Sequence, residues 1–272
     1  MSPKPEPRIR IGVGGWTYAP WRGAFYSDGL AYKRELEYAS RQLTSIEING
    51  TYYGLEKPDT FARWHDETPD DFVFALKGPR FITNRRVLSD AGPAIVRFFA
   101  SGVMVLKGKL GPINWQLMPT KAFDPVDFAG FLKLLPKRVD GQTIRHAVEL
   151  RHDSFRVADA VALARDRGVA IVVAGDSQYP QIADPTAPFA YARIMGTMDA
   201  EPLGYAEKEL DRWVKRARLL RSGAVPADLA TVCKPAAART NRDVFLYVIS
   251  GFKIRNPAAA MAMIQRLGRP GR

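Results

Sequence analysis

The chain of 272 residues contains a single cysteine, Cys233, and only three histidines. One cysteine excludes an internal disulfide bond, and no histidine lies near it in sequence to activate it as a nucleophile. The scarcity of both residue types also argues against a zinc site, and neither HxH nor HExxH spacing occurs. No apolar run approaches the ~18 residues that span a membrane, so we predict no membrane association.

The first residues are polar and rich in proline, and they lack the apolar region of a secretory signal. We therefore expect residues 1–8 to form a disordered lead-in to a cytoplasmic protein, and residues 269–272 to form a basic tail. No linker, internal repeat or low-complexity tract divides the remainder. This organisation predicts one domain over residues 9–268.

Positive charge is in excess, with 40 Lys and Arg against 28 Asp and Glu and a formal net charge of +12. Such an excess suggests an acidic partner, either a nucleic acid or a phosphorylated metabolite. The charge is spread along the chain rather than blocked, so we interpret most of it as solvated surface.

Strand-like and helix-like segments alternate along the chain. Strands are predicted over residues 10–15, 44–49, 72–77, 112–117, 147–151, 169–174, 190–194 and 244–249. Helices are predicted over residues 33–42, 59–67, 94–106, 124–135, 157–167, 207–220 and 256–267. Eight strand–helix alternations in about 250 residues predict an α/β fold, a single TIM-type (β/α)₈ barrel. A doubly wound open sheet is the alternative, but no G-x-G-x-x-G fingerprint follows the first strand.

Polar side chains intrude where the predicted strands end. Residues two apart in a strand share a face, so Glu47 points with Asn49, and Glu149 with Arg151. The other strand ends carry Lys77, Gln116, Asp176 and Arg193. Buried charge costs free energy unless it is paired or used, and the carboxyl ends of barrel strands meet at one mouth. The pattern predicts one shared polar pocket.

We interpret this pocket as an anion site. Lys77, Arg151 and Arg193 would hold a phosphate or carboxylate, and Glu47 or Glu149 would act as general acid or base. The alternative is a closed ion-pair network, such as Glu149 with Arg193, that fills the barrel interior. Glu47, Glu149 and Asp176 offer oxygen ligands for Mg²⁺ or Mn²⁺, but the neighbouring Lys and Arg compete for them, so we expect no metal and no cofactor.

Aromatic residues follow the first two predicted strands. Trp16, Tyr18 and Tyr53 are candidates for stacking against a sugar or a base. The alternative is that they pack the long first loop over the top of the barrel.

Six segments complete the sequence pattern, and they resemble, in order along almost the whole chain, the motifs of the YecE-like family, also called domain of unknown function 72. The segments are Gly14–Tyr18 with Trp21–Gly23 and Phe25–Tyr26; Ile46–Tyr53; Phe74–Arg80 with Ile82–Thr83; Gly111–Leu117 with Pro119; Ala147–His152 with Ser154–Phe155; and Tyr191–Arg193 with Gly196. The resemblance implies a TIM-type barrel and no established activity.

The chain also departs from that family pattern at three places. Asn84 and Met195 stand where the family commonly has histidine, and Ile249-Ser250-Gly251 replaces its FNN motif. These departures put histidine-dependent chemistry in doubt. Three hypotheses therefore stay open: an enzyme acting on a small phosphorylated or carboxylated compound, a barrel that binds or processes nucleic acid, and a ligand sensor without catalysis. The oligomeric state is not predicted.

Overall fold

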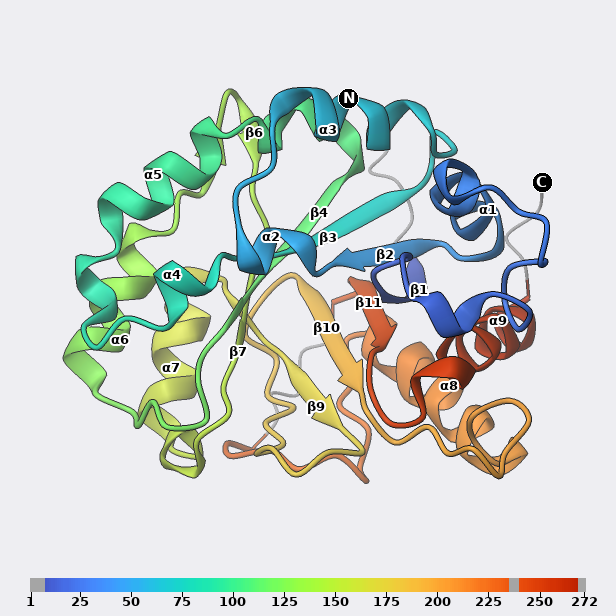
Figure 1. Ribbon diagram of the computed structural model, residues 1–272. Coiled ribbons are helices and arrows are strands. Elements are labelled where there is room, and N and C mark those ends of the chain that lie inside the picture. The colour runs from blue at the N-terminus through green and yellow to red at the C-terminus, as the bar shows by residue number, and fades with distance from the viewer. Residues whose placement is uncertain (1–7, 235–239, 269–272) are drawn as a thin grey trace, which may run out of the picture.

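The computed structural model describes residues 8–234 and 240–268. Its main sheet is parallel throughout and follows the order β8-β7-β4-β3-β2-β1-β11-β10-β9 (Figure 1). The strands are β1 (Ile9–Gly14), β2 (Ser45–Ile48), β3 (Val73–Lys77), β4 (Leu110–Gln116), β7 (His146–Glu149), β8 (Ala170–Ile171), β9 (Val173–Gly175), β10 (Phe189–Ile194) and β11 (Asp243–Val248). Each of the eight predicted strands is present.

The two edges of this sheet are halves of one extended segment, residues 170–175. Its first half, β8, pairs with β7, and its second half, β9, pairs with β10. Between them the Val172 N–H donates to the Val148 carbonyl oxygen at 2.9 Å. The sheet therefore curls round to form a TIM-type barrel, which is the predicted fold class.

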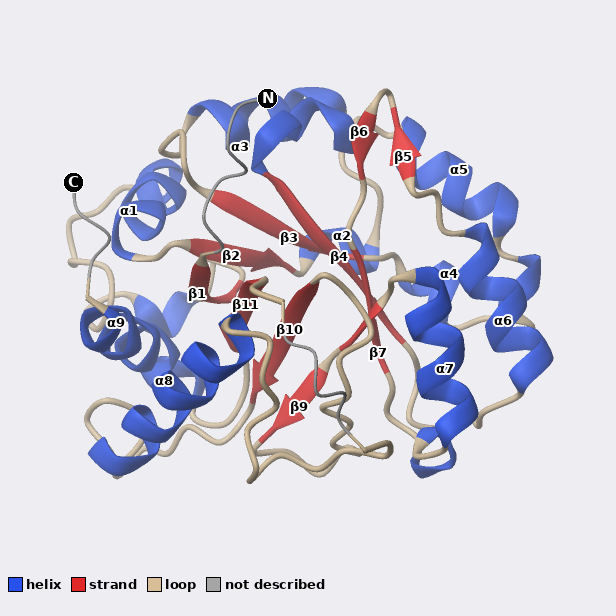
Figure 2. Cartoon of the chain, turned by 180° about the vertical axis from the view of Figure 1, so that it is seen from behind, coloured by secondary structure: helices blue, strands red, loops and turns tan. Residues whose placement is uncertain are grey.

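Helices surround the barrel (Figure 2). They are α1 (Glu35–Gln42), α2 (Gly50–Tyr53), α3 (Pro58–Asp66), α4 (Arg80–Thr83), α5 (Gly92–Ala100), α6 (Pro125–Leu134), α7 (Ala158–Arg167), α8 (Glu207–Arg221) and α9 (Asn256–Leu267). A small antiparallel hairpin, β5 (Arg138–Val139) with β6 (Gln142–Thr143), precedes β7. Within the described ranges no helix is long and apolar enough to cross a membrane.

Local signals in the sequence set several helix ends. The Asp124 carboxylate accepts from the N–H groups of Val126 and Asp127 and so caps α6. Gly168 ends α7 with a φ of 65°, in the left-handed region that glycine tolerates.

The predicted helix over residues 94–106 is wrong in its second half. The helix α5 ends at Ala100, and Gly102 then turns the chain with a φ of 109°. Residues Val103–Lys109 form a 3₁₀ segment instead. A Cβ at Gly102 would come within 2.7 Å of the Pro58 Cα, so the close approach of α3 requires glycine here.

The expectation of eight complete strand–helix alternations fails at one crossover. Residues 176–188, which join β9 to β10, are all described and contain no helix. Figure 1 shows loops alone beneath β9 and β10, between α7 and α8. This loop is fastened to a second one, because the buried Asp184 accepts from the N–H groups of Val232 and Cys233.

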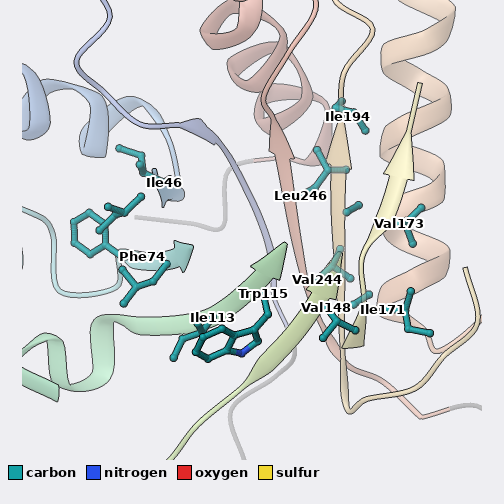
Figure 3. Packing of buried hydrophobic residues seen from close by; sticks show 14 of the residues in the cluster. Ile46, Phe74, Ile113, Trp115, Val148, Ile171, Val173, Ile194, Val244 and Leu246 are labelled. Atoms are coloured by element: carbon teal, nitrogen blue, oxygen red, sulfur yellow. The ribbon is translucent and has the colours of Figure 1, made fainter. Parts of the chain in front are cut away.

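Alternate residues of each strand line two separate cores. The outer core packs between sheet and helices, and Figure 3 shows Ile46, Phe74 and Leu246 among its members. The inner core fills the barrel with aromatic and small side chains: Val73, Ala75, Ala147, Ala170, Val172, Phe189, Tyr191, Phe245 and Tyr247. This filling leaves polar side chains at the carboxyl end of the strands.

A buried histidine in the outer layer makes stability depend on pH. Trp115 Nε1 donates to His146 Nδ1 at 3.1 Å, and His146 Nε2 donates to the Pro136 carbonyl oxygen at 2.9 Å. Burial lowers the pKa of His146 from 6.5 to about 4, so the folded state favours the neutral ring. Its contribution to stability is complete above pH 6.5 and is lost as the pH falls towards 4.

We expect the free energy of unfolding, measured in urea, to fall by about 2–3 kcal/mol between pH 7 and 4.5 because His146 must ionise on unfolding. In His146→Gln this part of the pH dependence should disappear, since an amide does not titrate. The control is His65→Gln, because His65 pairs with Asp66 at the surface. An unchanged slope in His146→Gln would contradict the assignment.

Candidate functional site

Five strands deliver polar side chains to the carboxyl end of the barrel. These side chains are Glu47 at β2, Lys77 at β3, Gln116 at β4, Glu149 at β7 and Arg193 at β10. All five are buried, and the two glutamates are 0% exposed. The alternation of strand residues places them on the inward face, directly above the aromatic inner core.

Arg193 stands at the centre of this cluster and joins its two carboxylates. Its Nη2 donates to Glu47 Oε1 at 2.9 Å, and its Nη1 donates to Glu149 Oε2 at 2.5 Å. The side chain of Arg193 is 5% exposed, so both ion pairs are shielded from water. The interaction of Glu149 with Arg193 is thus present, as the ion-pair interpretation anticipates.

The remaining carboxylate oxygens also have donors. The Tyr191 hydroxyl donates to Glu47 Oε2 at 2.6 Å, and Arg151 Nε donates to Glu149 Oε1 at 2.8 Å. Asn114 adds a bond to Glu149 Oε2 at 3.2 Å. Every carboxylate oxygen of the two glutamates therefore accepts at least one hydrogen bond, which fits them to hold the arginines in place.

Electrostatics keep this pair of charges ionised. Burial alone would raise the pKa of Glu149, but the Arg193, Arg151 and Lys77 cations outweigh it and lower that pKa to about 2. Burial likewise disfavours the Arg193 cation, yet Glu149 and Glu47 together raise the pKa of Arg193 above its ordinary value. Glu149 therefore has no proton to donate near neutral pH, and the geometry favours it as an anchor rather than as a general acid.

One neutral oxygen receives three cationic donors. Gln116 Oε1 accepts from Lys77 Nζ at 2.7 Å, from Arg151 Nη2 at 2.9 Å and from Arg193 Nη1 at 3.3 Å. A carbonyl oxygen has two lone pairs, so the three donors exceed its capacity. Arg193 Nε and Asn114 Oδ1 are buried in the same cluster and have no hydrogen-bond partner among the described residues. The cluster thus has hydrogen-bonding capacity that its own side chains do not use.

Two tyrosine rings lie over the outer cations. Lys77 Nζ lies 4.2 Å from the centre of the Tyr52 ring, and the Arg151 guanidinium lies 4.2 Å from that of Tyr179. The Tyr179 hydroxyl also accepts from Arg151 Nη1 at 3.3 Å. Both rings are half-buried, so part of each ring reaches solvent while it covers its cation.

Four members of this cluster were not predicted from the sequence: Asn114, Tyr191, Tyr52 and Tyr179. The first two could have been found, because each lies two residues before a predicted member of its own strand, Gln116 or Arg193. Tyr179 belongs to the helix-free loop, where no periodicity indicates which way a side chain points.

Two predicted polar residues make no bond to the cluster. Asn49 lies beside β1, and a Cβ at Gly14 would meet its Nδ2 at 2.9 Å. Asp176 is exposed and accepts instead from Trp213 Nε1 at 2.8 Å. The cause is the backbone of Asp176, whose φ of 52° breaks the alternation of β9 and turns the side chain towards α8.

The three predicted aromatic residues have separate surroundings. Trp16 packs edge-on against Trp64 with ring centres 5.2 Å apart, so it packs against the protein itself, as the alternative to ligand stacking expects. Tyr18 lies under Lys253, whose Nζ is 4.2 Å from the ring centre. Tyr53, next to Tyr52 on α2, is 67% exposed and is the most accessible ring of the three.

Two cavities lie away from the mouth. A groove of about 650 Å³ runs along the outer face between α6 and α7, and a cavity of about 20 Å³ lies beside β8, β10 and Arg242. In residues 8–234 and 240–268 no group of three or more His, Cys, Asp or Glu side chains is placed to hold a metal ion.

The fold and this charged mouth define a class, a (β/α)₈ barrel whose strand ends carry a cluster of interlocked arginine, lysine and glutamate side chains. Residues 10–272 match the family described as "Protein of unknown function DUF72", and the chain belongs to that family.

Among curated proteins, the UPF0759 protein YecE of Escherichia coli strain K12 is 29% identical over 150 residues, which are 54% of this chain and 50% of that protein; YecE of strain O157:H7 matches equally. The match thus spans about half the length of these relatives.

Solved structures of the same family share the fold. A DUF72 family protein from Thermotoga maritima superposes with a TM-score of 0.70 at 18% identity, covering 96% of this chain and 98% of that one. A second, from Enterococcus faecalis, gives a TM-score of 0.70 at 17% identity and covers 97% of each chain. At this identity the likeness establishes the barrel architecture.

Proposed function

We propose that the protein binds a small anionic compound, phosphorylated or carboxylated, at the barrel mouth. One observation carries the proposal: three cationic donors, from Lys77, Arg151 and Arg193, crowd onto the single neutral oxygen of Gln116. An anionic oxygen at this place would accept the hydrogen bonds that Gln116 cannot accept and would offset the repulsion among the cations.

The charge balance of the cluster supports the same proposal. The three cations stand against the two carboxylates of Glu47 and Glu149, which leaves one positive charge in excess. Buried charge in excess is unfavourable unless a ligand or solvent compensates it. Arginine pairs held in a fixed orientation by carboxylates suit the bidentate recognition of phosphate or carboxylate.

The competing interpretation is that the ion pairs only fill the barrel end. It accounts well for Arg193, because both Nη atoms donate to buried carboxylates and only Nε has no partner among the described residues. It accounts poorly for Lys77, because no carboxylate of the described residues forms an ion pair with its ammonium group. The two interpretations differ in whether small anions bind at all.

Isothermal titration calorimetry with inorganic phosphate and small sugar phosphates separates them. We expect Arg151→Gln to weaken binding by about 10- to 100-fold, because a charge-assisted hydrogen bond contributes about 1.5–3 kcal/mol. Arg156→Gln removes the same charge from an exposed position in the same loop and should bind like wild type. Equal affinities in the two variants, or no binding by wild type, would favour the ion-pair interpretation.

A nucleic acid is the second candidate, and one surface favours it. Beside the mouth, Tyr53 exposes its ring, and the Arg80 guanidinium lies 5.5 Å from the centre of that ring. Arg85 and Arg86 are exposed just beyond α4. If single-stranded oligonucleotides bind with an affinity that falls steeply with salt, and small anions do not bind, this candidate replaces the first. A cytoplasmic location stays a prediction under either.

A further inference from the structure

Lys77 differs from the other two cations of the mouth in its partners. Arg151 and Arg193 each form ion pairs with buried glutamates, whereas the Lys77 ammonium group donates to a neutral amide oxygen at 2.7 Å. Its other neighbour is the face of Tyr52. Lys77 is 7% exposed, so water solvates its charge poorly. A lysine held in this way gains little from staying protonated.

The surroundings of Lys77 make a neutral amine accessible. Burial and the adjacent Arg193 and Arg151 cations outweigh the attraction of Glu47 and Glu149, and they lower the pKa of Lys77 from 10.5 to about 8. About one tenth of the molecules would then carry a neutral amine at pH 7. A desolvated lysine next to other cations is the usual setting of an amine that attacks carbonyl groups.

We propose that Lys77 forms an imine with a carbonyl compound that also carries an anionic group, such as an oxo acid or an aldehyde or ketone phosphate. This inference rests on the proposed anion site, and it names the substrate class and the reacting atom. The anion would bind Arg151, whose Nη2 contacts the same Gln116 oxygen as Lys77 Nζ. A carbonyl carbon one bond from a carboxylate, or a few bonds from a phosphate, would then lie within reach of Lys77 Nζ.

The step balances without an oxidant or reductant. Solvent takes a proton from the Lys77 ammonium group, and the free electron pair of Nζ attacks the carbonyl carbon to form a carbinolamine. The carbinolamine oxygen then takes up protons and leaves as water, and a protonated carbon–nitrogen double bond remains. Glu149, whose pKa the neighbouring cations lower, stays ionised nearby, so its charge stabilises the iminium cation.

The Tyr52 ring lies against this amine. It comes from α2, at the end of β2, and its centre is 4.2 Å from Nζ. The ring and the other neighbours leave Lys77 only 7% exposed, so the amine is shielded from bulk water.

Pyridoxal 5′-phosphate is a suitable probe, because it joins an aldehyde and a phosphate in one small molecule. The protein is incubated with the probe at pH 7, and borohydride then reduces any imine by adding hydride to its carbon, which fixes the label. Peptide mass spectrometry measures the extent of labelling at each lysine. We expect Lys77 to be labelled about 10-fold faster than the exposed Lys33, because its lowered pKa provides neutral amine at this pH and the anion site holds the phosphate of the probe beside it.

Three controls separate this inference from general lysine labelling. Inorganic phosphate should slow labelling of Lys77 and leave Lys33 unchanged, and pyridoxal, which lacks the phosphate, should label Lys77 more slowly than pyridoxal 5′-phosphate does. The labelling rate at Lys77 should rise with pH and reach half of its maximum near pH 8. Lys77→Arg keeps the charge and should lose the fast label, with an unchanged circular dichroism spectrum to show that it folds.

The outcomes distinguish the two proposals. If phosphate binds in an Arg151-dependent way but Lys77 is labelled no faster than Lys33, imine formation is overturned and the anion site stands. If phosphate does not bind and Lys77 is not labelled, both proposals fail. Fast labelling of Lys77 that phosphate does not affect would overturn the requirement for an anionic substrate.

Discussion

Arg193→Met should destabilise the protein by about 3–5 kcal/mol, measured as the free energy of unfolding in urea at pH 7. The substitution keeps much of the apolar stem but removes the guanidinium group that Glu47 and Glu149 share. Two fully buried carboxylates then lose their common partner, and desolvation of an unpaired charge is among the largest single costs in a folded protein.

The control for this experiment is Arg212→Met in α8. Arg212 pairs with Glu209 across one helical turn, and its side chain is 50% exposed, so the loss should stay below about 1 kcal/mol. A loss at Arg193 no larger than that at Arg212 would show that the buried cluster contributes nothing to stability.

The stability loss caused by Arg193→Met should depend on pH. In wild type the Glu149 contribution is present above pH 4.5 and is lost as the pH falls through about 2, since its folded pKa is depressed. Without Arg193, burial dominates and protonation of the carboxyl groups becomes favourable. The difference in unfolding free energy between wild type and variant should therefore shrink as the pH falls from 7 to 5.

Gly12→Ala should cost about 3 kcal/mol, also measured by urea unfolding. Gly12 lies in β1 opposite Ser45 of β2, and a Cβ there would come within 1.8 Å of the Ser45 carbonyl oxygen. The obstacle is backbone rather than a movable side chain. The two strands must therefore separate, which strains their parallel hydrogen bonds.

Gly54→Ala is the matched control for Gly12. Gly54 is extended, with φ of −162°, and a Cβ there meets nothing within 4 Å. Alanine should be neutral or slightly stabilising at this position, because it restricts the unfolded chain. Similar stabilities for the two variants would mean that β1 and β2 do not approach as closely as described.

The strands could be predicted because the barrel buries both faces of each one, which leaves short apolar runs separated by polar loops. Two errors in the helices have local causes. Gly102 adopts a positive φ that ends α5 early, although the apolar spacing continues beyond it. The count of eight alternations was too high by one, because no helix was predicted or is present over residues 176–188, where Asp184 holds the loop through its backbone partners.

The centre of the site could be predicted from strand parity alone. Glu47, Glu149 and Arg193 meet because parallel strands end at one mouth and their inward residues alternate. The same alternation wrongly predicted that Asp176 points into the mouth, because its positive φ redirects the side chain. It gave no information on Tyr179, because a loop residue is placed by tertiary contacts rather than by a repeating backbone.

The most direct test of an anion site at the mouth is the pKa of Lys77 with and without phosphate. Protein with ¹³C-labelled lysine can be titrated by NMR, and Lys77→Arg assigns the signal. Burial, together with the Arg193 and Arg151 cations, holds the pKa of this ammonium group near 8 in the protein alone, against the opposing attraction of Glu47 and Glu149. A bound anion favours the charged form, so the pKa should rise when phosphate saturates the site. A pKa of Lys77 that phosphate leaves unchanged would contradict the anion site.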